Sequence, residues 1–232
     1  MPIRVEYAIV GRQRYLRIFG FAGYDRNVSF FVRGPAARGH GGRGDRMTEV
    51  GVIHGRFQVL HNDHLKYLLA GKARCRHLVV GITNPDPLLT RDDPADPARS
   101  SPLANPLTYF ERYQLIRTVL PEAGLDPLSF SIVPFPINFP ELYRHYVPLD
   151  AVFYLTIYDD WGRRKLEQFE AMGLTTEVLW ERPSAEKGLS AEDIRRLMVR
   201  GEPWQHLVPT ATATLMQQWD IASRLHRFHG CV

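Results

Sequence analysis

The chain has 232 residues, of which 44% are hydrophobic and 23% charged, a composition that is ordinary for a globular protein. This length suits one α/β domain, or one domain with an appendage, and no stretch approaches the roughly 20 apolar residues that a membrane-spanning helix needs. The net charge is +4, but residues 1–46 hold nine arginines and three acids, whereas the remainder holds 20 basic and 22 acidic residues. The basicity belongs to the appendage, which argues against nucleic acid as a partner.

The two cysteines, Cys75 and Cys231, lie far apart and lack the spacing of a metal site. They are interpreted as free thiols in a reducing compartment. The first residues also lack the charged-then-apolar layout of a signal peptide. A cytoplasmic protein is therefore expected, with no membrane partner.

Residues 1–46 are expected to be separate from the main domain. Apolar runs at 7–10 and 28–32 could form a short hairpin, and residues 34–46 have the Gly- and Arg-rich composition of a flexible linker. Met47 follows directly. Two interpretations stay open: an N-terminal extension that is partly disordered, or an upstream segment that precedes a true start at Met47. The domain itself is expected at 47–232.

From Met47 onward, short apolar runs alternate with stretches of helical spacing. Strands are predicted at 50–54, 77–82, 130–134, 151–156 and 176–180. Helices are predicted at 63–73, 106–123, 140–146, 161–172, 191–200 and 209–219. The proline-rich stretch 84–105 is predicted to be a long loop, of the length that often forms a lid. This alternation indicates an α/β fold, a Rossmann-like parallel sheet with helices on both faces.

Ligands of such sheets bind beyond the carboxyl ends of the strands, so the loop after the first strand of the domain is the first candidate site. Gly55 allows the backbone to turn closely around a ligand. Arg56 offers a fork of donors for phosphate. His61 and His64 would share one face of the helix that they open, and the N-terminus of that helix attracts anions. A lone histidine here would more often be structural, but the combination predicts a phosphate site.

The stretch Gly55-Arg56-Phe57-Gln58-x-x-His61-x-x-His64 resembles the signature of the nucleotidyltransferase superfamily with the His-x-Gly-His motif. It is most similar to the nicotinamide-mononucleotide adenylyltransferase branch. Val59 stands where that branch usually has proline, and Asp63 stands where it usually has glycine.

Two further stretches carry the resemblance. Residues 189–198 are similar to the family's Ser-x-Thr-x-Ile-Arg segment, with Ser190 as a helix N-cap and Glu192 in place of the usual threonine. Residues 105–112 are similar to an Asn-Pro-x-Thr-x-x-Glu-Arg stretch. There Thr108 is expected near a helix start, and Glu111 and Arg112 are expected to make structural pairs.

The resemblance implies transfer of a nucleoside monophosphate from a nucleoside triphosphate to a phosphate- or phosphonate-bearing acceptor, with release of pyrophosphate. It implies Mg²⁺ held by substrate phosphates and water, and no protein ligand for the metal is assigned. Homo-oligomerisation is left open. The implied catalytic residues are His61, His64 and Arg195, and the implied nucleotide-binding residues are Gly55, Arg56, Phe57, Gln58, Ser190 and Ile194. Lys66 is a weaker candidate on the first helix.

The substrates are expected to differ from those of the branch. Segments after the third and fourth strands, at 134–138 and 155–161, depart from its usual Asp-Ile-Asn and Thr-Gly-Asn. The residues suggested to line the acceptor site are Asn105, Asn138, Tyr158 and Trp161. A pocket narrowed by bulky side chains suits a small acceptor, as in relatives of this branch from phosphonate-antibiotic pathways.

The resemblance to those relatives, which use CTP, implies the favoured hypothesis: a CTP-dependent cytidylyltransferase that acts on a small phosphonate such as phosphonoformate. The residues themselves do not distinguish cytosine from adenine. The alternative is a nicotinamide-mononucleotide adenylyltransferase of NAD biosynthesis. A remoter alternative is a catalytically silent nucleotide-binding module, because Asp63 and Glu192 add negative charge beside a polyphosphate.

Overall fold

The computed structural model describes residues 4–10, 13–19, 47–90, 101–186 and 188–229 of the chain. Near the N-terminus, β1 (Arg4–Val10) pairs in antiparallel fashion with β2 (Gln13–Phe19) as a two-stranded sheet of its own. The predicted strand at 7–10 is part of a hairpin, but its partner is 13–19 and not the predicted run at 28–32. The apolar run at 28–32 and the predicted linker at 34–46 lie outside the described residues, as do residues 91–100 of the predicted loop.

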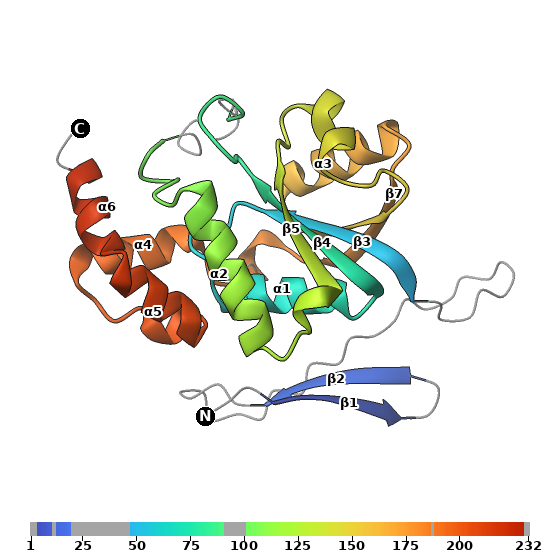
Figure 1. Ribbon diagram of the computed structural model, residues 1–232, viewed down its shortest axis with the longest axis horizontal. Coiled ribbons are helices and arrows are strands. Elements are labelled where there is room, and N and C mark those ends of the chain that lie inside the picture. The colour runs from blue at the N-terminus through green and yellow to red at the C-terminus, as the bar shows by residue number, and fades with distance from the viewer. Residues whose placement is uncertain (1–3, 11–12, 20–46, 91–100, 187, 230–232) are drawn as a thin grey trace, which may run out of the picture.

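The main sheet has five parallel strands in the order β5-β4-β3-β6-β7 (Figure 1). They are β3 (Thr48–Gly55), β4 (Cys75–Thr83), β5 (Phe130–Phe135), β6 (Val152–Ile157) and β7 (Thr175–Glu181). Four of these strands contain a predicted apolar run, and β6 lies one residue later than the predicted 151–156. The predicted α/β class and parallel sheet are thereby confirmed.

Helices connect the strands and complete the C-terminal part of the fold. The α-helices are α1 (Asn62–Lys72), α2 (Tyr109–Glu122), α3 (Asp160–Ala171), α4 (Ala191–Arg200), α5 (Thr210–Gln218) and α6 (Ile221–His229). Short 3-10 turns are η2 (Pro127–Ser129), η3 (Pro140–His145), η4 (Ser184–Glu186) and η5 (Gln205–Leu207). The predicted helix at 140–146 is thus a 3-10 turn. Helix α6 was not predicted.

Helix α2 begins three residues later than predicted. Thr108 is its N-cap, and a reciprocal capping box joins the Thr108 and Glu111 side chains to each other's backbone N–H groups. Before the cap, the backbone of Leu107 is held outside the helix, since its N–H and C=O both bond to the side chain of Gln58. Residues 106–107 are therefore unavailable to the helix.

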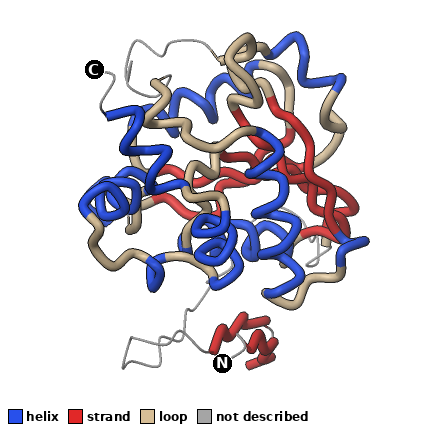
Figure 2. The backbone as a smooth tube through the Cα atoms, turned by 60° about the vertical axis from the view of Figure 1, so that its left-hand side comes forward, coloured by secondary structure: helices blue, strands red, loops and turns tan. Residues whose placement is uncertain are grey.

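The sheet separates two hydrophobic cores, and the strand residues alternate between them. Ile53 and Val80 face a core formed with α1, α2 and the C-terminal helices, whereas Val52 and Val79 face a core that includes Phe169 of α3. Figure 2 shows the strands running between helices. Helices therefore cover both faces, as the sequence predicts.

The chain reverses its direction of travel across the sheet between β3 and β6. The backbone pairing of these two strands covers only Gly51–Val152 and Val52–Phe153, so that it ends before either strand does. Beyond it, the carboxyl end of β3 leads into α1 and that of β6 leads into α3. This is the switch point at which open α/β sheets bind ligands.

Candidate functional site

A cavity of about 750 Å³ lies at this switch point, within the usual size range of small-molecule sites. The loop after β3, the ends of β4 and β6, and the first turns of three helices line it. Those helices are α1, α3 and α4, and the side chains of their N-cap residues, His61, Asp159 and Ser190, each accept a backbone N–H bond. Three helix N-termini at one cavity favour a ligand with several negative charges.

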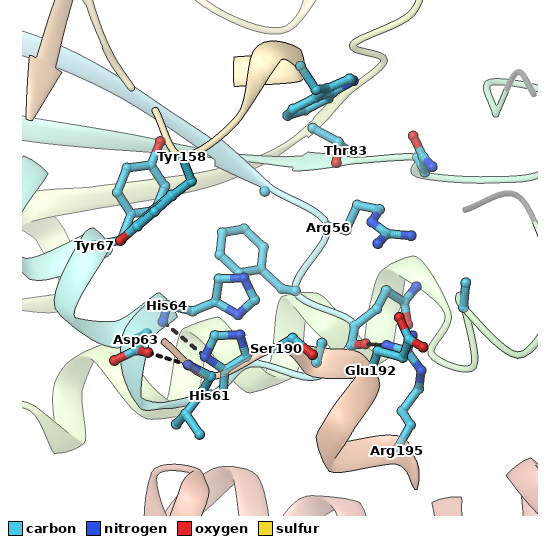
Figure 3. A pocket seen from close by; sticks show the side chains of 18 of the residues that line it. Arg56, His61, Asp63, His64, Tyr67, Thr83, Tyr158, Ser190, Glu192 and Arg195 are labelled. Atoms are coloured by element: carbon cyan, nitrogen blue, oxygen red, sulfur yellow. Dashed lines mark hydrogen bonds between the residues drawn. The ribbon is translucent and has the colours of Figure 1, made fainter. Parts of the chain in front are cut away.

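The two predicted histidines stack on each other at the centre of the site (Figure 3). Their ring centroids are 3.8 Å apart. Nδ1 of His61 accepts the backbone N–H of His64 at 3.4 Å, so the ring proton of a neutral His61 is on Nε2. Nδ1 of His64 lies 3.1 Å from the carbonyl oxygen of Val59, which can only accept. His64 therefore carries its proton on Nδ1, and Nε2 of its neutral form is an acceptor.

Both histidines are uncharged at neutral pH. Burial, together with the charge of Lys66, lowers the pKa of His61 from 6.5 to about 3. Burial and the neighbouring His61 also lower the pKa of His64 well below 6.5. An arriving polyphosphate would oppose these effects, because a nearby anion favours the protonated ring.

The charged groups of the cavity leave it suited to an anion. The lining includes the cationic side chains of Arg56, Lys165, Arg195 and Arg196, against the three carboxylates of Asp63, Asp159 and Glu192. Each carboxylate has a partner: Lys66 for Asp63, the N–H of Gly162 for Asp159, and Arg196 for Glu192.

Arg195 is held from inside the protein. Its guanidinium donates to the carbonyl oxygen of Gln58, in the loop that follows β3, and burial lowers its pKa. Although only 8% of the residue is exposed, it lines the cavity. The loop that follows β3 and the first turns of α4 are thereby joined through the guanidinium of Arg195.

The structure brings most of the predicted site residues together. The cavity is lined by Gly55, Arg56, Phe57, Gln58, His61, His64, Asn138, Tyr158, Trp161, Ser190 and Arg195. The amide of Gln58 is already used by the backbone of Leu107. Three predicted residues are not in the lining, and one of them is the weaker candidate Lys66, which pairs with Asp63. Ile194 is fully buried in the core on the inner face of α4, and Asn105 donates its amide to the carbonyl oxygen of Ser101 before α2.

Sequence reasoning missed the residue that shapes the loops of the site. Arg112, in α2, is 1% exposed, and its guanidinium donates to the carbonyl oxygens of Arg56, Thr83 and Asn84 at 2.7 to 3.1 Å. It thus fastens the carboxyl ends of β3 and β4 to one helix. The sequence predicts structural pairs for Arg112, but its acceptors are backbone atoms, which no residue pattern reveals.

An aromatic wall, formed by Tyr67, Tyr158 and Trp180, was predicted only in part. Trp180 donates its indole N–H to the hydroxyl of Tyr158 at 2.7 Å. The ring centroids of Trp180 and Tyr67 are 6.1 Å apart in an edge-to-face arrangement. All three residues line the cavity, and Figure 3 labels two of them, Tyr67 and Tyr158.

No group of three or more metal-binding side chains occurs among the described residues. None of the helices in the described part of the chain is long and apolar enough to cross a membrane.

Comparison with known proteins identifies relatives over most of the chain. No family model matches it. A protein of Streptomyces viridochromogenes named phosphonoformate cytidylyltransferase is 50% identical over 181 residues, which cover 78% of this chain and 97% of that protein. A nicotinamide-nucleotide adenylyltransferase of Thermococcus kodakarensis is 30% identical over 174 residues, which cover 74% of this chain and 84% of that one.

Among solved structures, the fold is similar to a bifunctional NMN adenylyltransferase/ADP ribose pyrophosphatase from Francisella tularensis, with a TM-score of 0.54. The sequences are 15% identical, and the match covers 76% of this chain and 52% of that one, so the chain spans about half of that bifunctional protein. At this identity the likeness concerns the fold alone.

Proposed function

We propose that this chain transfers a cytidylyl group from CTP to a small phosphonate such as phosphonoformate. The chain belongs to the nucleotidyltransferase family that includes phosphonoformate cytidylyltransferase and the nicotinamide-nucleotide adenylyltransferases. The observation that carries the choice of substrates is the 50% identity to phosphonoformate cytidylyltransferase, against about 30% to adenylyltransferases. The setting would be the biosynthesis of a phosphonate natural product.

In the proposed reaction, a phosphonate oxygen attacks the α-phosphorus of CTP in line with the leaving group. A new P–O bond forms, the bond between the α-phosphorus and the bridging oxygen breaks, and pyrophosphate leaves with the electron pair. Catalysis of this kind depends on positioning and on stabilising negative charge. His61 and His64 are assigned to the α-phosphate and the leaving group. Arg56, Ser190 and Arg195 are assigned to the outer phosphates.

The hydrogen bonds of the histidines support this assignment. His61 has its Nδ1 engaged by the N–H of His64, so its Nε2–H is the donor left for a phosphate oxygen. His64 can donate from Nε2 only when it is protonated, since its Nδ1–H is directed at Val59. We propose that the bound triphosphate supplies the negative charge that keeps His64 protonated during transfer.

Mg²⁺ is the proposed cofactor, and it would neutralise charge on the triphosphate. The donor set fits an ion held mainly by phosphate oxygens and water. Of the carboxylates that line the cavity, two already hold an N–H donor or a lysine, and Glu192 pairs with Arg196. Mg²⁺ commonly keeps several waters and binds through substrate phosphates.

The aromatic wall supports a small base or a small acceptor. Tyr158 and Trp180 are locked by their hydrogen bond, and Ser184 donates its hydroxyl to the carbonyl oxygen of Tyr158. Side chains held in this way resist displacement by a bulky ligand. They leave less room than small residues would at the same end of the cavity.

The test measures pyrophosphate release by the purified protein with Mg²⁺, using CTP and ATP, each with phosphonoformate and with nicotinamide mononucleotide. Release is expected with CTP and phosphonoformate. With the other three pairs it is expected to be at least about a hundredfold slower, because a site whose polar groups hydrogen-bond one substrate rejects a substrate that leaves them unpaired. The product is identified by its mass. Turnover of ATP with nicotinamide mononucleotide at the faster rate would instead support the adenylyltransferase alternative.

A further inference from the structure

Asp63, which stands where the family motif usually has glycine, lies in the first turn of α1 directly before His64. Each of its carboxylate oxygens accepts a hydrogen bond. The backbone N–H of Leu189 donates to Oδ2 at 2.8 Å, and Nζ of Lys66 donates to Oδ1 at 2.7 Å. The first of these bonds joins residues that are 126 positions apart in the chain.

The bond to Leu189 fixes the segment that leads into α4. The next residue, Ser190, is the N-cap of that helix, and Arg195 follows in its second turn. Both residues line the cavity, as do Gly188 and Leu189 themselves. Figure 3 shows Asp63 beside His61, with Ser190 and Arg195 on the neighbouring segment. The position of Leu189 relative to α1 therefore sets how the N-terminus of α4 faces the histidine pair.

The segment also approaches Asp63 too closely for a larger residue. A Cβ atom added to Gly188 would lie 2.2 Å from Oδ2 of Asp63, well inside van der Waals contact. Glycine at position 188 and a carboxylate at position 63 are thus matched to each other.

The negative charge of Asp63 would by itself repel a polyphosphate. Its ion pair with Lys66 offsets that charge, and both side chains are about one-third exposed, at 31% and 38%. The carboxylate is consequently a hydrogen-bond acceptor whose charge is largely compensated.

We infer that Asp63 is a positioning residue for the triphosphate: its carboxylate holds residues 188–190 against α1, so that Ser190 and Arg195 face His61 and His64. This inference rests on the proposed nucleotidyl transfer at the same site. It assigns to Asp63 a favourable effect on binding, which is the opposite of what repulsion by a carboxylate would produce.

The sign of the effect is tested by the affinity of the whole protein for CTP with Mg²⁺, measured by titration calorimetry without acceptor. Asp63→Gly is expected to weaken binding about tenfold, because a hydrogen bond to a charged acceptor is lost. Asp63→Asn keeps an oxygen acceptor for Leu189 and is expected to stay within about threefold of the wild type. Tighter binding by both variants would show that repulsion dominates and would overturn the inference.

The match between positions 63 and 188 provides a second test. Gly188→Ala alone is expected to weaken CTP binding about tenfold, because its methyl group displaces the carboxylate. Added to Asp63→Gly, the same substitution is expected to cost less than about twofold, since the obstructing carboxylate is gone. Equal losses in both backgrounds would contradict the inference. The matched control is Asp126→Gly, which removes a carboxylate that accepts the N–H of Leu128 before β5, and it is expected to bind CTP normally.

A readout without nucleotide separates failure of this inference from failure of the proposed function. Hydrogen exchange at the amide of Leu189 is expected to be about tenfold faster in Asp63→Gly than in the wild type, because its acceptor is missing. In steady-state assays, the variant is expected to raise KM for CTP while KM for the acceptor stays unchanged. Unchanged exchange at Leu189 would overturn the inference whichever triphosphate the enzyme uses. Faster exchange with unchanged triphosphate affinity would overturn it as well.

Discussion

His61 and His64 differ in hydrogen-bonding capacity although their rings stack. His61 can donate from Nε2 as a neutral ring, whereas His64 has its only neutral-state proton directed at Val59. The stacking also means that a positive charge on one ring disfavours a charge on the other. The pair is consequently suited to hold one added proton when an anion is present.

We expect His61→Ala and His64→Ala each to lower kcat for pyrophosphate release by at least about a hundredfold, the usual cost of removing a donor or acid from a transition state. Both should remain folded, with His61→Ala losing about 1 kcal/mol because the N-cap of α1 is removed. Circular dichroism and denaturant unfolding check the fold. The control is His77→Gln, at the opposite end of β4, which should keep wild-type kcat. A His64→Ala enzyme with near-normal kcat would refute the assigned site.

Binding of the triphosphate should also be coupled to a proton. The pKa of His64 lies well below 6.5 in the free protein, and the bound phosphates raise it, so protons are taken up on binding. Calorimetry at pH 7 in buffers of different ionisation enthalpy measures this uptake. The wild type should take up more protons than His64→Gln. Identical uptake by the two proteins would show that His64 stays neutral in the complex.

At the scale of elements, α2 holds the loops of the site in place although none of its residues lines the cavity. Arg112 reaches the ends of β3 and β4 through three backbone carbonyl oxygens, and burial lowers its pKa to about 10. The loops that carry Arg56 and Asn84 therefore depend on one buried guanidinium. Its fixed fork of donors is what allows several acceptors to be reached at once.

Arg112→Lys should reduce the free energy of unfolding by about 3 kcal/mol, because lysine keeps the charge but leaves buried carbonyl oxygens unpaired. It should also lower kcat/KM, since the loop that follows β3 loses a support. Urea denaturation and steady-state kinetics measure the two effects. Arg117→Lys, on the exposed side of the same helix, serves as the control and should change neither quantity. A loss of less than about 0.5 kcal/mol in Arg112→Lys would show that the loops hold their shape without it.

The elements that the sequence predicts well are those with strong local signals. The five strands are short apolar runs next to turn residues, and Ser190 and Thr108 are N-caps followed by an acid three residues later. Helix α6 has only a short helical spacing of apolar residues, at Ile221, Leu225 and Phe228, and such a brief pattern is weak evidence.

The candidate site residues also differ in how well the sequence predicts them. The histidines and arginines of the cavity lie in contiguous motifs, so the sequence places them together. The contact of Asp63 with Leu189 and those of Arg112 with the loops join residues that are distant in the chain and involve backbone atoms. Nothing in the order of the residues encodes such contacts, because they depend on how the elements pack.

For the whole molecule, buried histidines make the stability depend on pH. The pKa values of His54, His61 and His64 are all lowered by burial, so the unfolded chain binds protons that the folded protein does not. The contribution of these histidines to the free energy of unfolding is therefore fully present above pH 6.5. It is lost as the pH falls below 6.5, and for His61 the loss continues down to about pH 3.

Between pH 6.5 and pH 5, protonation of His61 in the unfolded chain should by itself lower the free energy of unfolding by about 2 kcal/mol. The change is about 1.36 kcal/mol for each pH unit. Urea denaturation at the two pH values measures the loss. His54 packs between Phe135 and Phe169, and His54→Leu should remove its share of the pH dependence. Equal stability of the wild type at both pH values would mean that the histidines become hydrated and protonated within the folded state.

Helix α6 contacts α2 and also contributes to the lining of the cavity. Arg224 forms a two-pronged ion pair with Glu111 of α2, and Leu225 lines the cavity that begins at the end of β3. The lining of the cavity is therefore complete only when α6 has packed against the rest of the domain. A ligand that binds there stabilises the packing of α6 together with that of the sheet, because it binds the folded protein alone.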